Sequence, residues 1–240
     1  MSRHPYSTIK RLVGKAIHQY RMISDGEKIA VGLSGGKDSL ALMWILTERL
    51  SRIPISYELF PIHVDPGFEG SDLSLLEEYC TRMNYNLRVE RTDIGLRAHR
   101  EENRENPCFS CSRLRRKRLF EVASELGCNK LALGHHKDDI IETLFMNMCY
   151  GGTISTMLPS QSLFNGAFTI IRPLSYIDED IISRFAEKKD FPMFRNACPS
   201  EKHSRRYEIK QMLSELYKTN QKIKGNIFRS MSHVNTDYLL

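Results

Sequence analysis

The chain has 240 residues, enough for one core with an appendage or for two small domains. It lacks both a run of roughly 18 apolar residues and the apolar segment of a secretory signal, so we expect a cytoplasmic protein without a membrane anchor. The formal net charge of +6 weakly favours a polyanionic partner. Six cysteines without a secretory signal argue against a disulfide framework, and clustered ones become candidates for metal or redox chemistry.

The first predicted element is an amphipathic, basic helix between Ser7 and Ile23. Its apolar residues recur at helical spacing and its basic residues lie elsewhere around the turn. We expect this helix to pack on the core. The predicted organisation is an N-terminal helical segment (1–26), a main domain (27–195), and a C-terminal segment with a cysteine loop and basic helices (196–240).

The segment KIAVGLSGGKDS, residues 28–39, reads as a strand, a tight loop and the start of a helix. Gly35 and Gly36 let consecutive backbone N–H groups converge on an anion at the helix N-terminus. Asp38 beside a polyanion implies a Mg²⁺ ion between them. A plain glycine turn is the alternative, but strand, loop and helix all fall where phosphate binding requires them. The residues of this predicted phosphate site are Ser34, Gly35, Gly36, Lys37, Asp38 and Ser39.

Further apolar segments read as strands that alternate with helices, which predicts a doubly wound, mostly parallel α/β sheet with helices on both faces. Ligands bind such sheets at the carboxyl ends of the strands. His63 and Asp65 end one segment, and His135 and His136 end another, so we expect them to converge with the glycine loop on one edge. The segments are Tyr57–Asp65, Leu87–Asp93, Lys130–Gly134 and Phe168–Leu174, and a helix is expected over about 71–83.

A second polar group lies in GHHKDDIIETLFMNMCYGG, residues 134–152. His135, Asp138, Asp139 and Glu142 have the spacing of one helix face and would point together toward a ligand. The alternative is helix capping, with Asp138 as the N-cap and Glu142 as its reciprocal partner. Capping does not account for the paired histidines or for Asp139.

The clustered cysteines are Cys108 and Cys111 in PCFSC, with Cys198 in a later loop. A single C-x-x-C suits a redox pair, half of a zinc site or an iron–sulfur site. Zinc would need a fourth ligand such as His99 or His203, whereas three cysteines suit a cluster with one iron left open. The basic run RLRRKR (113–118) and the basic C-terminal segment suit either a track for a nucleic-acid backbone or solvated helix faces.

SGGKDS resembles the PP-loop of the ATP-pyrophosphatase (adenine nucleotide α-hydrolase-like) superfamily, and GHHKDDIIET resembles the second signature of its tRNA-modifying members. From Ile9 to about Tyr207 the chain resembles the tRNA 2-thiocytidine synthetase (TtcA) family. That resemblance implies ATP, Mg²⁺ and a [4Fe-4S] cluster held by Cys108, Cys111 and Cys198. It also implies a tRNA substrate, a sulfur donor such as a cysteine desulfurase, and a homodimer.

The implied reaction adenylates the C2 oxygen of a cytidine in the anticodon loop, at position 32, with release of pyrophosphate. Sulfur then replaces AMP to give 2-thiocytidine. Catalytic roles fall on Lys37, Asp38 and Asp139, with Asp38 and Asp139 holding the metal. Besides the glycine loop, the residues expected to bind ATP are His63, Gly134, His135 and Arg172. The residues expected to bind RNA are Arg113, Arg115, Arg116, Lys117, Arg205 and Arg206.

The chain departs from the TtcA pattern after residue 192. Well-known bacterial members carry a second C-x-x-C there, whereas RNACPSEKHSRR has one cysteine. This difference leaves 2-thiouridine synthesis open, because related cluster-dependent enzymes thiolate uridine. Two other functions stay open: transfer of lysine or ammonia to an RNA base, which needs no iron, and a zinc-containing RNA-binding module that uses ATP only as a ligand.

Overall fold

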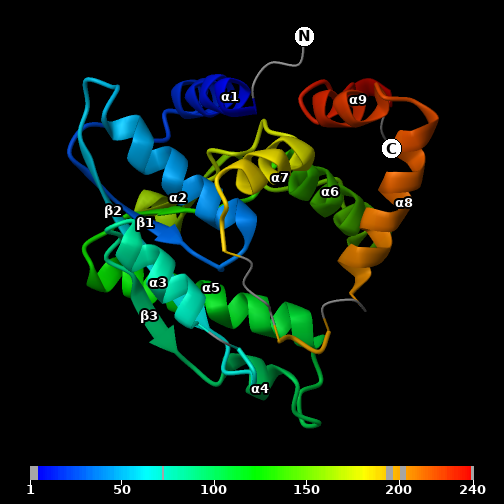
Figure 1. The fold of residues 1–240 in the computed structure, drawn as a ribbon. Helices are drawn as coiled ribbons and strands as arrows, with labels where there is room; N and C mark the ends of the chain where they lie inside the picture. The colour runs from blue at the N-terminus through cyan, green and yellow to red at the C-terminus, as the bar shows by residue number, and fades with distance from the viewer. Residues whose placement is uncertain (1–4, 72, 193–196, 201–203, 239–240) are drawn as a thin grey trace.

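A six-stranded sheet forms the centre of the molecule (Figure 1). The computed structural model describes residues 5–71, 73–192, 197–200 and 204–238. The strand order is β3-β2-β1-β4-β6-β5, and every neighbouring pair is parallel except β5 with β6. The strands are β1 (Glu27–Gly32), β2 (Tyr57–Asp65), β3 (Arg88–Arg91), β4 (Lys130–Ala132), β5 (Ser160–Leu163) and β6 (Phe168–Ile171). The predicted mostly parallel α/β fold is confirmed.

Strand β5 was not predicted. Its sequence, SQSL, lacks the apolar run or alternation that signals a strand. It forms because it folds back on β6 through the short helix η1 (Phe164–Gly166), where Phe164 and Asn165 have positive φ angles of 52° and 54°. The hairpin adds an antiparallel edge to the sheet.

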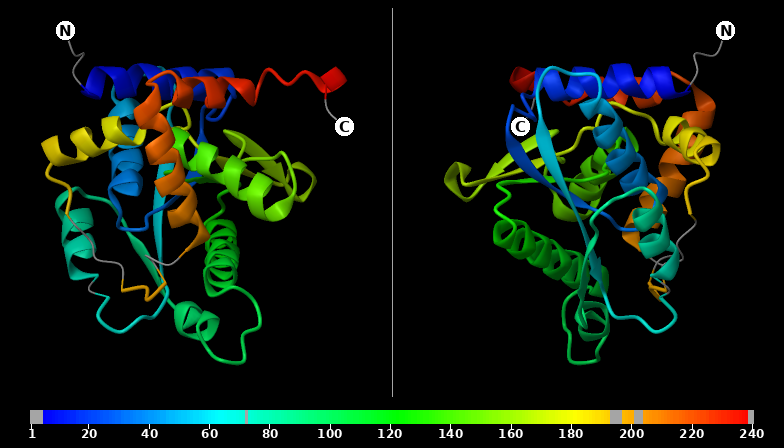
Figure 2. Two further views of the ribbon diagram at one scale, coloured as in Figure 1. Left: turned by 90° about the vertical axis from the view of Figure 1, so that its right-hand side faces the viewer. Right: turned by 60° about the vertical axis from the view of Figure 1, so that its left-hand side comes forward.

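Helices cover both faces of the sheet (Figure 2). On one face α1, α2, α3 and α7 share the largest hydrophobic core, and on the other α5 packs its buried Val122 and Ala123 against β1, β2 and β4. The helices are α1 (Pro5–Gln19), α2 (Lys37–Leu50), α3 (Ser74–Arg82), α4 (Ile94–Ala98), α5 (Pro107–Glu125), α6 (Lys137–Gly151), α7 (Glu179–Lys188), α8 (Arg205–Thr219) and α9 (Ile223–Ser230).

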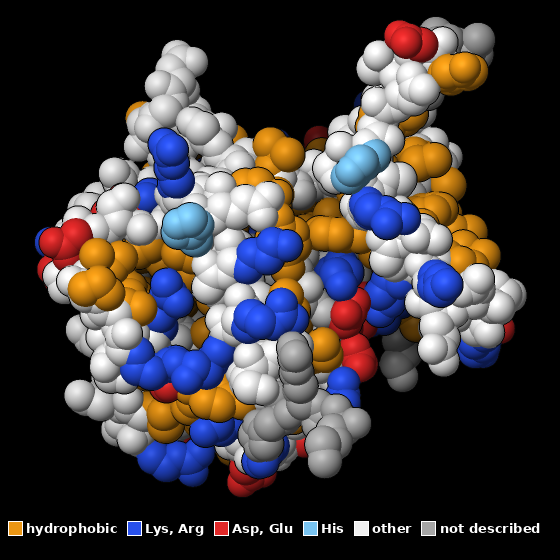
Figure 3. All heavy atoms as spheres, turned by 90° about the horizontal axis from the view of Figure 1, so that it is seen from above, with side chains coloured by type: hydrophobic (Ala, Val, Ile, Leu, Met, Phe, Trp, Pro, Cys, Tyr) orange, Lys and Arg blue, Asp and Glu red, His pale blue; other side chains and the backbone are white. Residues whose placement is uncertain are grey.

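The predicted amphipathic N-terminal helix is α1, which buries Ile9, Val13, Ala16 and Ile17 against the core. Its last turns meet α9 at one aromatic side chain, Tyr176. The rings of Tyr176 and Phe228 pack edge to face at 5.9 Å, and Lys15 Nζ lies 5.1 Å from the Tyr176 ring centroid. Helices α1 and α9 thus form one face, over which Lys and Arg side chains are spread with scattered acidic ones between them (Figure 3).

The C-terminal helices attach to α6 by a small apolar cluster that contains Ile141, Ile209 and Leu213. The predicted boundary between residues 195 and 196, together with Lys202 and His203, falls on positions outside the described residues. None of the described helices is long and apolar enough to cross a membrane.

Candidate active site

The glycine loop leaves β1 and closes on itself before α2 begins. Gly35 has a φ of +85°, which a residue with a Cβ rarely adopts. Ser39 Oγ accepts a hydrogen bond from Ser34 N (3.1 Å) and donates one to Gly36 O (2.9 Å), so the two serines tie the ends of the loop together. The loop therefore presents the N-terminus of the 14-residue helix α2 as an anion site.

The second signature touches this loop at Gly134. A Cβ built on Gly134 would lie 3.0 Å from the backbone carbonyl of Asp38 and from Ser39 N. Any side chain would therefore push β4 away from the glycine loop. This explains the glycine at the end of β4 and places the two signatures in direct backbone contact.

Asp38 carries a buried carboxylate oxygen that no hydrogen bond satisfies within the part of the chain that the structure describes. Oδ2 lies 3.3 Å from Lys37 Nζ, but Oδ1 is buried and its nearest ionisable neighbour is His136 Nε2 at 3.8 Å. Burial raises the pKa of Asp38, and the charges of His136 and Lys37 partly offset that rise. An unsatisfied buried carboxylate oxygen beside a phosphate site fits a Mg²⁺ ligand.

Asp139 caps its own helix. His136 N donates to Asp139 Oδ2 (2.9 Å), and Asp139 N donates to His136 Nδ1 (3.4 Å), which is a capping box. The alternative cap considered from the sequence, Asp138 with Glu142, is not the one that forms. Because α6 begins at residue 137, the residue that precedes it is a histidine whose ring nitrogen can accept the hydrogen bond.

Asp138 instead fastens α7, whose first residue is Glu179. Its Oδ2 accepts a hydrogen bond from Glu179 N at 2.8 Å, and its Oδ1 lies 2.5 Å from Lys224 Nζ of α9. Glu179 in turn reaches the glycine loop, because its Oε1 accepts from Lys37 Nζ at 3.1 Å. The sequence analysis missed Glu179; its signal, an acidic residue in the first turn of a helix, is shared by many ordinary surface helices.

Two histidines make hydrogen bonds next to the glycine loop and the second signature. His63 is only 1% exposed, and its Nδ1 lies 2.7 Å from Leu33 O, just before the glycine loop. His135 Nδ1 accepts from Arg172 Nε (3.2 Å), and burial lowers the pKa of His135 to about 4, which keeps its ring neutral. The buried Arg172 also donates to Leu158 O (2.5 Å). His135 lies before α6, not on its face as predicted.

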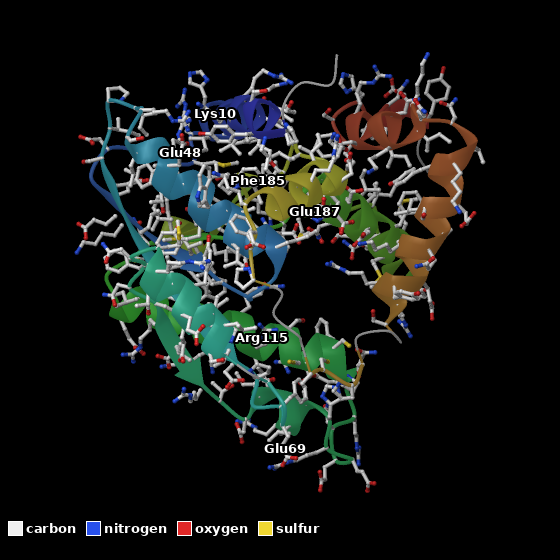
Figure 4. All side chains as sticks on the ribbon, viewed as in Figure 1. Lys10, Glu48, Glu69, Arg115, Phe185 and Glu187 are labelled. Atoms are coloured by element: carbon white, nitrogen blue, oxygen red, sulfur yellow. The ribbon has the colours of Figure 1, made fainter. Side chains whose placement is uncertain are left out.

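A cavity of about 200 Å³ opens between the ends of β1, β2 and β4 and helix α5. Its lining combines apolar side chains of the three strand ends and α5 with Ser112, Arg115 and Arg116 of α5 and with Ser34 and His135 of the two signatures. Figure 4 labels Arg115 on α5. An apolar lining with two guanidinium groups suits an aromatic ligand that carries negative charge. Arg115 and Arg116, both predicted to bind RNA, line this cavity.

The three predicted cluster ligands lie near one another at the start of α5. Burial raises the pKa of the Cys108 thiol, and the nearby Cys198 raises it further. Burial likewise raises the pKa of Cys111; Arg115 partly offsets this rise, and Cys198 and Cys108 add to it. Within the described ranges, no three His, Cys, Asp or Glu side chains stand at metal-binding spacing. The three cysteines are thus neighbours of the soft ligand type that iron or zinc prefers, but in this structure they do not stand at ligand spacing.

His99 does not fit the role of a zinc ligand. Its Nε2 lies 2.9 Å from Ser200 Oγ and its Nδ1 lies 2.8 Å from Gly95 O, so both ring nitrogens are engaged. These contacts instead fasten the Cys198 loop to α4. His203, the other named zinc candidate, is outside the described residues.

The remaining basic residues are partly neutralised by neighbours. Arg113 pairs with Glu105 at 2.8 Å, and Lys117 is 3.8 Å from Glu121 and largely exposed. On α8, Arg205 stacks on the Tyr150 ring at 4.8 Å. Its neighbour Arg206 turns inward, where it lies 3.4 Å from Asp139 Oδ1 and 4.0 Å from Glu142 Oε2. The six predicted RNA-binding residues are therefore divided between the pocket, the second signature and solvent.

A family model described as a PP-loop domain matches residues 5–216. The tRNA-cytidine(32) 2-sulfurtransferase of Syntrophotalea carbinolica is 40% identical over 239 residues, which cover 98% of this chain and 92% of the relative. The chain belongs to this family of PP-loop proteins. The family member from Geobacter sulfurreducens is 39% identical, with 98% and 93% coverage. The predicted family is confirmed.

A solved structure shares the fold over nearly the whole of this chain. The U34-tRNA thiolase NcsA from Methanococcus maripaludis, described with its [4Fe-4S] cluster, superposes with a TM-score of 0.79 at 28% identity. The match covers 96% of this chain and 80% of NcsA. A TM-score of 0.52 at 14% identity to an NH3-dependent NAD synthetase from Campylobacter jejuni extends the likeness of fold alone.

Glu142 supplies a prediction about how the stability of this protein depends on pH. Its side chain is 6% exposed, and burial together with Asp139 raises its pKa to about 7. The native state therefore binds a proton that the unfolded chain has already lost, and the free energy of unfolding should fall as pH rises from about 4.5 to 7. In Glu142→Gln this fall should shrink, leaving the variant on the order of 1 to 3 kcal/mol more stable than wild type at pH 8.

Urea unfolding of both proteins at pH 5 and pH 8, without added metal, measures this effect. Glu142→Gln should gain stability relative to wild type only at the higher pH. Equal stability differences at both pH values would contradict the raised pKa of Glu142.

Proposed function

We propose that the chain catalyses ATP-dependent thiolation of tRNA at cytidine 32. The observation that carries this proposal is the shared cavity, which joins Ser34 of the ATP loop to Ser112 and Arg115 beside the thiol pair. An adenylated base held there would have the ATP site on one side and the cysteines on the other. The names of the relatives, which specify cytidine 32 and sulfur transfer, support the same substrate and reaction.

In the first step the residues of the glycine loop hold the phosphates of ATP. Backbone N–H groups of residues 34–39 and the Lys37 ammonium offset the phosphate charge. Asp38, with its unsatisfied oxygen, and Asp139 would hold Mg²⁺ between them and the phosphates. The C2 oxygen of cytidine attacks the α-phosphorus, and pyrophosphate leaves. Arg115 would stabilise the negative charge that develops on the α-phosphate.

In the second step a sulfur nucleophile attacks C2 and the C2–O bond to AMP breaks, which leaves 2-thiocytidine. Cys108, Cys111 and Cys198 would hold a [4Fe-4S] cluster, which supplies the chemistry that delivers sulfur when it is bound. A base seated against the apolar side chains of the cavity would be shielded from water, which would otherwise hydrolyse the adenylate back to cytidine. A cysteine desulfurase as sulfur donor and a homodimeric assembly complete the proposal.

The test is nucleoside mass spectrometry of tRNA from a strain that lacks this gene, its parent, and a strain complemented with the wild-type gene. Loss and recovery of 2-thiocytidine supports the proposal. Loss of a 2-thiouridine instead keeps the chemistry but reassigns the base, as in the U34 thiolase that shares the fold. No change in any thionucleoside would favour the non-thiolating alternatives.

Phe109 supplies a prediction about the RNA. Although it lies between Cys108 and Cys111, its side chain is 60% exposed. Single-stranded bases stack on exposed aromatic rings, and each stack contributes about 1–3 kcal/mol. Phe109→Ala should therefore weaken tRNA binding about 5- to 150-fold, and Phe109→Trp should retain it. The matched control is Phe164→Ala on the η1 turn, which is 66% exposed and should bind tRNA normally. Filter binding with unmodified tRNA measures all four proteins; equal losses in both alanine variants would contradict base stacking at Phe109.

A further inference from the structure

Glu179 holds two ammonium groups that come from different parts of the chain. Its Oε1 accepts from Lys37 Nζ of the glycine loop at 3.1 Å and from Lys210 Nζ of α8 at 3.0 Å, and its Oε2 accepts a second bond from Lys210 at 2.8 Å. Although burial alone would raise the pKa of Glu179, Lys210 and Lys37 lower it to about 2. The carboxylate is therefore charged throughout the physiological range.

The backbone fixes where this carboxylate stands. Glu179 is the first residue of α7, its N–H is bonded to Asp138 of the second signature, and the helix N-terminus stabilises its negative charge. The side chain of Glu179 is 25% exposed, and its carboxylate reaches Lys37 at the end of the glycine loop. Its neighbour Asp180 is 64% exposed and makes an ordinary surface pair with Arg184 within α7. The two adjacent acidic residues thus have different tasks.

Without Glu179, each of the two ammonium groups could form an ion pair with another carboxylate nearby. Lys37 Nζ already lies 3.3 Å from Asp38, and Lys210 feels the charge of Asp139. Lys210 borders a hollow of about 450 Å³ between α6, α7 and α8, so packing does not hold its ammonium in place. Asp38 and Asp139 are the two residues that the proposed function assigns to Mg²⁺.

We propose that Glu179 is a positioning residue of the ATP site. It shares Lys37 with Asp38, which limits that ion pair, and it holds Lys210 on its own carboxylate, so that Asp38 and Asp139 remain available when Mg·ATP binds. The inference rests on the proposed ATP site and adds a residue that acts through Lys37 without touching the nucleotide. It also makes the ATP loop sensitive to the placement of α8, the helix that brings Arg206 to Asp139.

Simple electrostatics predicts the opposite result, which makes the inference testable. Removing a negative charge near a polyanion should tighten ATP binding at any Mg²⁺ concentration. If Glu179 positions the lysines, Glu179→Gln should instead weaken binding of ATP with Mg²⁺ about tenfold, and weaken binding without Mg²⁺ much less. The matched control is Asp180→Asn, which also removes one charge from the first turn of α7 and should bind ATP as wild type does.

Equilibrium titration of the full chain with ATP, in Mg²⁺ and in EDTA, measures the effect, with circular dichroism as the check of folding. Lys210→Met in the Glu179→Gln background should restore part of the Mg²⁺-dependent affinity, because one displaced ammonium group is gone. Lys218→Met removes an exposed lysine that lies eight residues after Lys210 on the same helix α8, and it should restore none of the affinity. If Glu179→Gln is unfolded, Glu179→Asp takes its place, since a side chain shorter by one methylene cannot hold both ammonium groups.

The outcomes separate the inference from the proposed function. A wild-type chain that fails to bind ATP overturns the proposed function itself. A wild-type chain that binds ATP, with a Glu179→Gln variant that binds Mg·ATP equally or more tightly, overturns only the positioning role. An equal loss with and without Mg²⁺, or rescue by both lysine variants, also overturns it.

Discussion

Asp38→Asn should abolish tRNA-dependent release of pyrophosphate, with a loss on the order of 1,000-fold. The amide keeps the size and the Oδ2 side of the carboxylate but removes the charge that the buried, unsatisfied Oδ1 would present to Mg²⁺. A metal ion beside transferring phosphate contributes several kcal/mol to the transition state. The measurement is pyrophosphate release with ATP, Mg²⁺ and unmodified tRNA.

The fold should tolerate this change, because the carboxylate is costly to the native state. Burial raises the pKa of Asp38 above its unfolded value, so the charged form destabilises the folded protein as pH rises through that range. Asp38→Asn should be at least as stable as wild type at pH 7. Asp65→Asn is the control, since Asp65 lies at the same sheet edge but has an ordinary task, accepting from Gly67 N at 2.9 Å. A residual rate within tenfold of wild type would remove Asp38 from the metal site.

Cys198→Ser should separate the two half-reactions. The thiol lies close enough to Cys108 and Cys111 to raise the pKa of both, and it is the single cysteine of its loop. We expect loss of bound iron, of visible absorbance and of 2-thiocytidine, with pyrophosphate release retained because the glycine loop and its carboxylates are untouched.

Cys149→Ala is the matched control for this experiment. Cys149 is an exposed free cysteine at the end of α6, so iron content and thiolation should be unchanged. Retention of full iron content and thiolation in Cys198→Ser would exclude Cys198 from the ligand set. Loss of pyrophosphate release together with thiolation would mean that adenylation depends on the cysteine loop.

Much of this architecture could be predicted because it follows from local pattern. The buried strand Tyr57–Asp65 was located to the residue, and the strand–loop–helix at the glycine loop was recognisable from short-range spacing. Parallel strands then required their carboxyl ends to meet at one edge. What the pattern could not contain was long-range pairing. β5 exists because β6 lies beside it, and a polar four-residue segment gives no periodic signal.

The same limit applies to side chains at the site. Asp138 and Asp139 are adjacent in sequence, and the pattern offered Asp138 as the alternative helix cap, yet Asp139 caps its own helix and Asp138 fastens α7. Arg115 and Arg116 looked like part of an exposed basic run, but α5 places both on the lining of the cavity, with Arg115 partly buried and Arg116 still exposed. Glu179 acquires its role only from Lys37, 142 positions earlier in the chain. Such roles depend on which neighbours the fold supplies.

The backbone contact at Gly134 determines which parts of the molecule are able to move during a catalytic cycle. Because Gly134 has no side chain, the segment just after β4 packs directly on the backbone of the first turn of α2, and we expect the two signature loops to move as one rigid unit. If a folded anticodon loop enters the proposed site, the segments that move to admit it should be α5 with the Cys198 loop, or α8. Spectroscopic labels across Gly134 should therefore report a constant separation through turnover, whereas labels between α2 and α5 should report opening and closing.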